Sequence, residues 1–447
     1  MQNHKLIKFH ITFKPLCNYI NMMRAGIFYR SNIVKAYKNI DRSQYFPANV
    51  IRELQLRLLN ALLMSSDLTW YSNKMNGPVT IKKILDRSIG LSKNELRDEF
   101  EKLYKPAKKE FDHVTSGSTG RPLKVISSNI SEVQRAAHRM RFYSWWGITP
   151  WDRNILIWGK MTTGQTERKC IKKRLKDILL EPRELFINVF ELSEATIGYY
   201  YQQGLEKKAI FIRGYTSGVY QFCSLMQKKG LDGKKLGIKL AIVTSEILLE
   251  DHRKFIKEIL GCKVANEYGA AEIGLFACEC PEGRMHICEE LNLLLTQPDD
   301  SLLVTDLHNT CTLLINYEIG DRIVISDKPC SCGRGLRVIE KIDGREGDLV
   351  KKPSGEFISQ YVFYYAAKEI AAMGFPDSIS QYKVIQQGLH FTVSIVKGAD
   401  FKAEAVGLFI DHIKQKIGKE ISVNIEFVNE VQKERNGKIR FFQRIDS

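Results

Sequence analysis

Apolar residues recur at helical spacing early in the chain. The segments NVIRELQLRLLNALLM and SKNELRDEFEKLY place apolar side chains three and four positions apart, as on one face of a helix. We therefore expect residues 1–110 to form a mostly helical lead-in.

From about residue 150 to about residue 320 the pattern changes. Short apolar runs such as RNILIWG, KKAIFIRG and GIKLAIVTSE alternate with helical patterns such as GVYQFCSLMQKKG and LLEDHRKFIKEIL. Alternation of this kind is typical of βαβ layers, in which helices cover a sheet. The central part of the chain is therefore predicted to be α/β.

A second change follows the segment KIDGREGDLV. Beyond it, LHFTVSIV and ISVNIEFV alternate as strands do, and FKAEAVGLFIDHIKQKIG between them is helical. This pattern predicts a small α+β module of about 100 residues, a size that can move as a lid. We expect a large N-terminal domain over residues 1–345 and a small mobile C-terminal domain over residues 346–447.

Composition and charge narrow the classes of protein. With 44% hydrophobic and 26% charged residues, the 447-residue chain has the composition of a folded protein and lacks the signature of disorder. A net charge of +16 favours anionic ligands or surfaces, among them nucleic acid, nucleotides, acidic glycans and lipid headgroups. Such an excess is also common on solvated surfaces without a ligand.

The N-terminal segment is basic and contains aromatic residues. It lacks the apolar stretch and small-residue cleavage site of a secretory signal, and no later segment approaches the roughly 18 apolar residues that span a bilayer. We expect a cytoplasmic protein whose ten cysteines are mostly reduced thiols or metal ligands. Peripheral membrane contact and simple helix packing both stay open for the N-terminal segment.

The stretch DHVTSGSTGRPLKV contains an unusual run of small and hydroxyl residues. Consecutive glycines let a backbone approach a ligand closely, and exposed N–H and O–H groups suit phosphate oxygens. The run does not match the pattern G-x-x-x-x-G-K-[ST], because Arg121 follows Gly120. The residues alone leave a phosphate-binding loop and a flexible connector as alternatives.

Four further segments follow TSGSTGRP in a fixed order, and they are NEYGAAEIG, YEIGDR, DGREGD and ERNGKIR. The first two follow apolar runs that read as strands, and DGREGD lies at the predicted domain junction. In this order the five segments resemble the adenylate-forming enzymes, and most closely the phenylacetate-CoA ligase branch with its capsule-biosynthesis relatives. The resemblance covers residues 110–350 well, the C-terminal module moderately and the first hundred residues weakly.

The resemblance implies ATP- and Mg²⁺-dependent activation of a small carboxylic acid as its acyl-adenylate. It also implies roles for the glycine-rich run. Six residues would cradle the β- and γ-phosphates, namely Thr115, Ser116, Gly117, Ser118, Thr119 and Gly120. Arg121 would add a cation where the family commonly has lysine, and a solvated loop residue is its alternative.

Within NEYGAAEIG, the resemblance makes Glu272 the Mg²⁺ ligand and a catalytic residue, and an exposed surface acid is the alternative. Tyr268 and Gly269 would line the adenine and acyl pocket. Family members usually carry a hydroxyl residue just before this glutamate, and here Ala270 and Ala271 stand there. One phosphate contact is therefore missing or supplied elsewhere.

Further along, the resemblance implies that the carboxylate of Asp321 in YEIGDR accepts hydrogen bonds from both ribose hydroxyls. The alternative is an aspartate that only stabilises a turn. Glu318 stands where relatives often have arginine. Arg345 would reach the ribose or a phosphate, and Asp348 would be the hinge between the two domains. The alternative is that this segment is an ordinary polar linker. Domain closure would bring the ammonium of Lys438 between the attacking carboxylate and the α-phosphate. The alternative is that Lys438 is an ordinary surface lysine.

Two segments rich in cysteine suggest a metal site apart from the reaction. CECPEGRMHICEE and CSCGRG supply two C-x-C pairs and one histidine, which can form a closed four-ligand site. By analogy with relatives that carry a zinc knuckle, we expect structural Zn²⁺, with Cys278 as a substitute ligand and buried reduced thiols as the alternative. The expected ligands are Cys280, His286, Cys330 and Cys332.

The second half-reaction is left open by the sequence. The acyl acceptor is a thiol such as CoA or an amine, and we lean towards surface-polysaccharide biosynthesis over an aryl-acid CoA ligase of catabolism. A different class of protein is a zinc-containing nucleic-acid-binding protein with a degenerate nucleotide fold. We disfavour it, and expect no specific nucleic acid, because workable residues fill every position expected to contact ATP.

Overall fold

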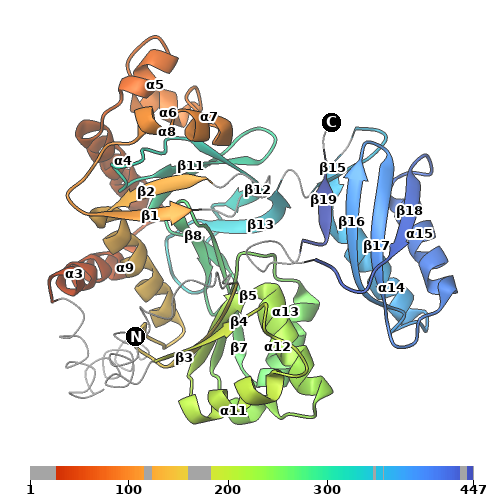
Figure 1. The fold of residues 1–447 in the computed structure, drawn as a ribbon. Coiled ribbons are helices and arrows are strands. Elements are labelled where there is room, and N and C mark those ends of the chain that lie inside the picture. Colours follow the sequence, from red (N-terminus) through yellow and green to blue (C-terminus); the bar gives the residue numbers. More distant parts are fainter. Residues whose placement is uncertain are drawn as a thin grey trace, which may run out of the picture. The chain divides into compact units, whose positions relative to one another are not determined.

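A computed structural model describes residues 27–114, 123–159, 183–345, 349–355, 357–432 and 440–445. Contacts divide the chain into two compact units. The first comprises Met1–Ile319 and Val324–Lys341, and the second comprises Gly320–Ile323 and Ile342–Ser447. Figure 1 labels most of their helices and strands.

The first described elements of the large unit are helices, some of which bury regularly spaced side chains. In the second of them, Ile51, Gln55, Leu59 and Leu62 are buried at intervals of three and four residues, which places them on one face. Ser92 and Glu95 form a reciprocal capping box that starts α7. The helices are α3 (Ile27–Ser43), α4 (Ala48–Ser65), α5 (Thr69–Lys74), α6 (Ile81–Leu85), α7 (Lys93–Asp98) and α8 (Phe100–Leu103).

An 11-stranded sheet follows, in the order β10-β11-β12-β13-β9-β8-β7-β6-β5-β3-β4. Its strands are β3 (Asn154–Trp158), β4 (Glu184–Asn188), β5 (Phe211–Tyr215), β6 (Leu240–Thr244), β7 (Lys263–Ala270), β8 (Gly274–Glu279), β9 (Met285–Ile287), β10 (Asn292–Thr296), β11 (Ser301–Asp306), β12 (Tyr317–Ser326) and β13 (Val338–Arg345). The strands from β3 to β7 pair in parallel, whereas β8 pairs antiparallel with β7 and β9. A separate antiparallel pair, β1 (Glu110–Val114) and β2 (Lys124–Ser128), precedes this sheet.

Both faces of the parallel strands are covered. On β6, Ala241 and Val243 pack into one apolar cluster, and Leu240 and Ile242 pack into another. Three helices cover the first face, namely α11 (Ile197–Lys207), α12 (Thr216–Lys228) and α13 (Glu250–Leu260), and α9 (Asn129–Trp145) covers the second (Figure 1). Burial on both faces explains why β6 contains the continuous apolar run LAIV.

A buried ion pair fastens α9 to its neighbours. Arg141 is 1% exposed and donates to Glu290 Oε1 at 2.8 Å and to the Ile40 carbonyl of α3 at 3.1 Å. Ser43 donates to the same glutamate at 2.6 Å. Although burial alone would raise the pKa of Glu290, Arg141 beside it lowers this pKa, so the carboxylate stays charged. Helices α3 and α9 are therefore joined by charge as well as by apolar packing.

The smaller unit has its own core. The strands β16 (Ile379–Gln387), β17 (His390–Lys397), β18 (Ser422–Phe427) and β19 (Phe442–Arg444) form a sheet in the order β18-β17-β16-β19. Phe363, Phe391, Phe409 and Phe442 meet in its apolar cluster. The other elements are β14 (Leu349–Lys351), β15 (Phe357–Ser359), α14 (Tyr361–Ala372) and α15 (Ala403–Ile417).

The predicted fold class, a large α/β part followed by a smaller α+β part, is confirmed. No helix among the described residues is both long and apolar enough to cross a bilayer.

Candidate functional site

Several predicted site residues lie outside the part of the chain that the structure describes. They are the phosphate-loop positions 115–121, the hinge Asp348 and the lysine Lys438. Arg345 is placed only as the last residue of β13. The roles of these residues stay predictions.

The segment NEYGAAEIG forms the end of β7 and a tight turn into β8. Gly269 pairs with Leu275, and Ala270 pairs with Gly274 after a shift in register. A side chain at Gly269 would clash with the carbonyl oxygen of Gly274, and Gly274 itself has φ +100°. Both positions therefore require glycine. The turn places Glu272 just beyond the carboxyl end of a parallel strand, the edge at which α/β sheets bind ligands.

Glu272 is only 5% exposed, which excludes the alternative of an exposed surface acid. The Tyr317 hydroxyl donates to its Oε1 at 3.4 Å, and the Lys93 ammonium lies 3.9 Å from the same oxygen. Lys93 belongs to α7, far away in sequence, and nothing in its local pattern distinguishes it from a surface lysine. Tyr268 is half-buried, with its ring edge-on to Phe276.

The segment YEIGDR was expected to follow a strand. Instead, it forms the first part of β12. Tyr317, Ile319 and Asp321 are buried while Glu318 and Gly320 are exposed, which is the alternation of a strand with one covered face. Asp321 is 8% exposed within this strand. Glu318 carries an exposed side chain, and its amide donates to the Leu91 carbonyl at 2.9 Å.

The structure brings the four predicted zinc ligands together. One ligand atom from each of Cys280, His286, Cys330 and Cys332 lies within 4.8 Å of the others. Cys280 begins the turn between β8 and β9, and Cys330 and Cys332 lie in the loop between β12 and β13. The sulfurs of Cys280 and Cys330 are 3.8 Å apart, and Nε2 of His286 is 3.2 Å from the sulfur of Cys332.

The chemistry of this cysteine cluster suits a divalent cation. Sulfurs bound to tetrahedral zinc at about 2.3 Å would lie about 3.8 Å apart, as those of Cys280 and Cys330 do. His286 donates from Nδ1 to the Leu336 carbonyl at 3.1 Å, which leaves Nε2 as the ligand nitrogen. Burial lowers the pKa of His286 to about 4, so the imidazole is neutral at pH 7.

Cys278, the predicted substitute ligand, is not part of the cysteine cluster. It is fully buried and packs with Cys288 in the apolar core under α9. Burial raises its pKa well above the usual value, as expected for an inert core thiol.

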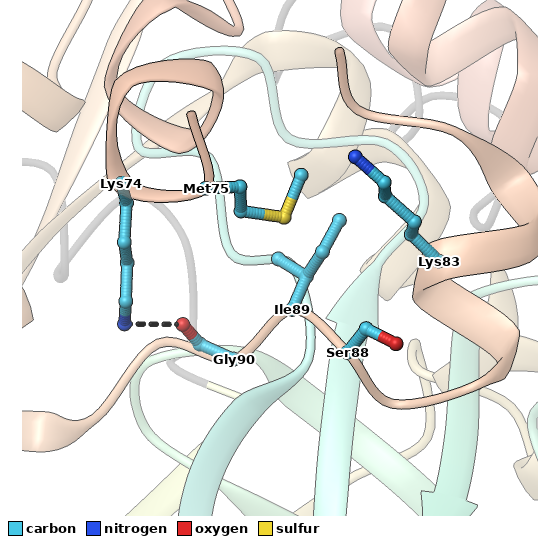
Figure 2. A pocket seen from close by; sticks show the side chains of 6 residues that line it. All are labelled: Lys74, Met75, Lys83, Ser88, Ile89 and Gly90. Carbon is cyan, nitrogen blue, oxygen red and sulfur yellow. Dashed lines mark hydrogen bonds between the residues drawn. The ribbon is translucent and has the colours of Figure 1, made fainter. Parts of the chain in front are cut away.

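A surface cavity of about 310 Å³ lies among the lead-in helices (Figure 2). It is lined by Lys74, Met75, Lys83, Ser88, Ile89 and Gly90. The ammonium of Lys74 donates to the Gly90 carbonyl at 2.8 Å, and that of Lys83 donates to the Pro78 carbonyl at 3.0 Å. Both lysines serve local backbone contacts, and no predicted site residue lines this cavity.

Comparison with known proteins gives matches over most of the chain. Residues 350–444 match the family model of the CapK C-terminal domain. Protein CapK of Staphylococcus aureus is 19% identical over 381 residues, covering 83% of this chain and 82% of CapK. A phenylacetate-coenzyme A ligase of Thermus thermophilus is 26% identical over 207 residues, covering 43% of this chain and 44% of that protein.

Among solved structures, a 2-hydroxyisobutyryl-CoA ligase in the postadenylation state matches with a TM-score of 0.68 at 14% identity, covering 91% of each chain. A likeness at this identity shows a shared fold. Together the matches confirm the resemblance of this chain to the adenylate-forming ligases, and in particular to the phenylacetate-CoA ligases and CapK.

Proposed function

We propose that this protein uses ATP and Mg²⁺ to join a carboxylic acid to AMP and then passes the acyl group to a thiol such as CoA or to an amine. The observation that carries the proposal is the placement of Glu272. This acid is buried at the carboxyl end of β7, in a glycine-bounded turn within a fold shared with a CoA ligase.

Adenylation needs charge neutralisation more than a protein nucleophile, because a carboxylate attacks the α-phosphorus while pyrophosphate leaves. Glu272 fits a hard cation, since its carboxylate is buried and makes two long contacts, at 3.4 Å and 3.9 Å. Bound Mg²⁺ would offset the negative charge of the phosphates. Residues 115–121 would hold the β- and γ-phosphates, Asp321 the ribose, and Tyr268 and Gly269 the adenine and acyl side.

For the acceptor, we favour a role in surface-polysaccharide biosynthesis over an aryl-acid CoA ligase of catabolism. CapK aligns over 83% of this chain, whereas the phenylacetate-coenzyme A ligase aligns over 43%. The net charge of +16 suits an anionic acceptor of either kind.

We also propose structural Zn²⁺ in the cysteine cluster. Three thiols and one neutral imidazole supply four ligands and leave no position open for a substrate, as in structural sites. The metal would fasten the β8–β9 turn to the loop after β12.

The test of the function is carboxylate-dependent exchange of labelled pyrophosphate into ATP. We expect exchange with at least one acid in a panel of aryl, fatty and amino acids, and none without Mg²⁺. Salt-dependent binding of DNA or RNA at submicromolar protein, combined with no ATP binding, would instead support the nucleic-acid alternative.

Replacing Asp321 with alanine is expected to weaken ATP binding roughly 10- to 100-fold, because two hydrogen bonds from the ribose to a charged group are lost. Calorimetric titration with ATP measures the change. Asp327, an exposed aspartate shortly after this one in the chain, is the matched control, and its alanine variant should bind ATP as the parent does. Equal affinities in both variants would remove Asp321 from the ribose site.

A further inference from the structure

A buried arginine contacts the turn that carries Glu272. Arg135 of α9 is 6% exposed, and its Nη2 donates to the Glu272 carbonyl at 3.2 Å and to Asp306 Oδ2 at 3.1 Å. A Cβ placed on Gly274 would lie 3.1 Å from Cδ of Arg135, so the arginine also packs against the far end of the turn. The turn from β7 to β8 therefore rests on this side chain.

The other arm of the same guanidinium extends the network towards β1. Nη1 of Arg135 donates to Glu132 Oε1 at 2.9 Å. That oxygen also accepts from the Ser127 hydroxyl at 2.7 Å and lies 3.0 Å from Nε2 of His113. His113 is near the end of β1, the strand that leads into residues 115–121. The network thus joins two segments that are distant in sequence.

Two acids hold the guanidinium of Arg135 in place. Although burial alone would raise the pKa of Glu132, His113 and Arg135 lower it to about 2, so the carboxylate is ionised at neutral pH. Asp306 is fully buried and pairs with Arg135. A guanidinium fork held between two carboxylates has little freedom to reorient. Its direction towards the Glu272 carbonyl is therefore set by the pairs around it.

We propose that Arg135 is a positioning residue for Glu272. It holds the β7–β8 turn and, through Glu132, the end of β1 in one arrangement, so that the glutamate faces its cation without reorganisation. The inference rests on the proposed function for the identity of the cation. Groups that orient a metal ligand in this way commonly change metal affinity about 10- to 100-fold when they are removed.

The chain offers a matched control on the same helix. Arg141 is also buried and also paired with a glutamate, but its contacts are Glu290 and the Ile40 carbonyl. Arg135→Lys and Arg141→Lys therefore remove a similar guanidinium from a similar environment. A general loss of stability from replacing a buried, paired arginine predicts the same outcome for both variants.

Two measurements on the full chain separate the roles. The first is amide hydrogen exchange of residues 269–275 without nucleotide, and we expect faster exchange in Arg135→Lys but not in Arg141→Lys. The second is ATP affinity with Mg²⁺ relative to affinity in EDTA, and we expect Arg135→Lys to lower this ratio about 10- to 100-fold while Arg141→Lys leaves it unchanged.

Unchanged exchange in the turn together with an unchanged Mg²⁺ ratio in Arg135→Lys would overturn the inference. If that variant fails to fold, Glu132→Gln decides, because it loosens one anchor of Arg135 and should shift both measurements in the same direction. No shift in Glu132→Gln would then overturn the inference. A parent protein that binds no ATP refutes the proposed function, and the exchange measurement still decides whether Arg135 holds the turn.

Discussion

Lys438→Ala is expected to lower carboxylate-dependent pyrophosphate exchange about 100- to 1000-fold, the usual effect of removing one donor that stabilises charge in a transition state. ATP affinity should stay nearly unchanged, because the ammonium is needed only where negative charge develops between the attacking carboxylate and the α-phosphate. Exchange kinetics and a separate ATP titration of the same variant distinguish these two effects.

The control for Lys438→Ala is the same substitution at another lysine of the smaller unit. Lys419 is exposed just after α15, and Lys419→Ala should exchange pyrophosphate at the parental rate. If Lys438→Ala also exchanges at the parental rate, the lysine of the C-terminal segment has no part in adenylation. A variant that loses ATP binding as well would instead place Lys438 in the ground-state nucleotide site.

Removing the metal from the cysteine cluster is expected to cost most of the stability of the large unit. Structural zinc contributes on the order of 10 kcal/mol to small metal-binding domains. Burial raises the pKa of Cys280 to about 12, so in an empty site this thiol would stay protonated and would lack the metal bond that holds it to the other ligands. Elemental analysis should find about one zinc per chain in the parent, the occupancy of one four-ligand site. Thermal unfolding with and without a chelator measures the loss.

Cys330→Ala tests the same idea against Cys278→Ala. Both cysteines are buried, but only the first belongs to the cysteine cluster. We expect Cys330→Ala to lose the zinc and Cys278→Ala to keep it, with at most the modest loss of stability that a small core truncation causes. A parent protein that contains no metal and is equally stable with chelator would end the zinc proposal.

The sequence predicted those helices and strands whose buried residues recur at regular positions along the chain. The first four residues of β6, LAIV, are all apolar because both faces of the strand are covered, and α15 shows its buried positions at helical spacing. The secondary structure of the segment YEIGDR was harder to predict, since glycine followed by aspartate is a common turn signal and Gly320 has a positive φ. Here the pair lies inside β12, so the neighbouring strands override the local preference.

Site residues could be predicted from the sequence only where they belong to a recognisable motif. The cysteine cluster illustrates the limit, because the sequence pointed to Cys280 as the ligand but kept Cys278 as a substitute. The structure separates them, since Cys278 faces the core and Cys280 begins the turn after β8. Arg135 carries no sequence signal at all, because its bond to the Glu272 carbonyl spans 137 residues. Contacts of that range depend on the completed fold.

The paired glycines that bound the β7–β8 turn restrict how this protein can be engineered. Gly269 is held by the nearby carbonyl of Gly274, and Gly274 by its positive φ and by Arg135. A library designed to change the preferred acid should therefore keep both codons fixed. Diversity belongs instead at Ala270 and Ala271, whose side chains are not buried. Variants that restore a hydroxyl there would be informative members to screen first.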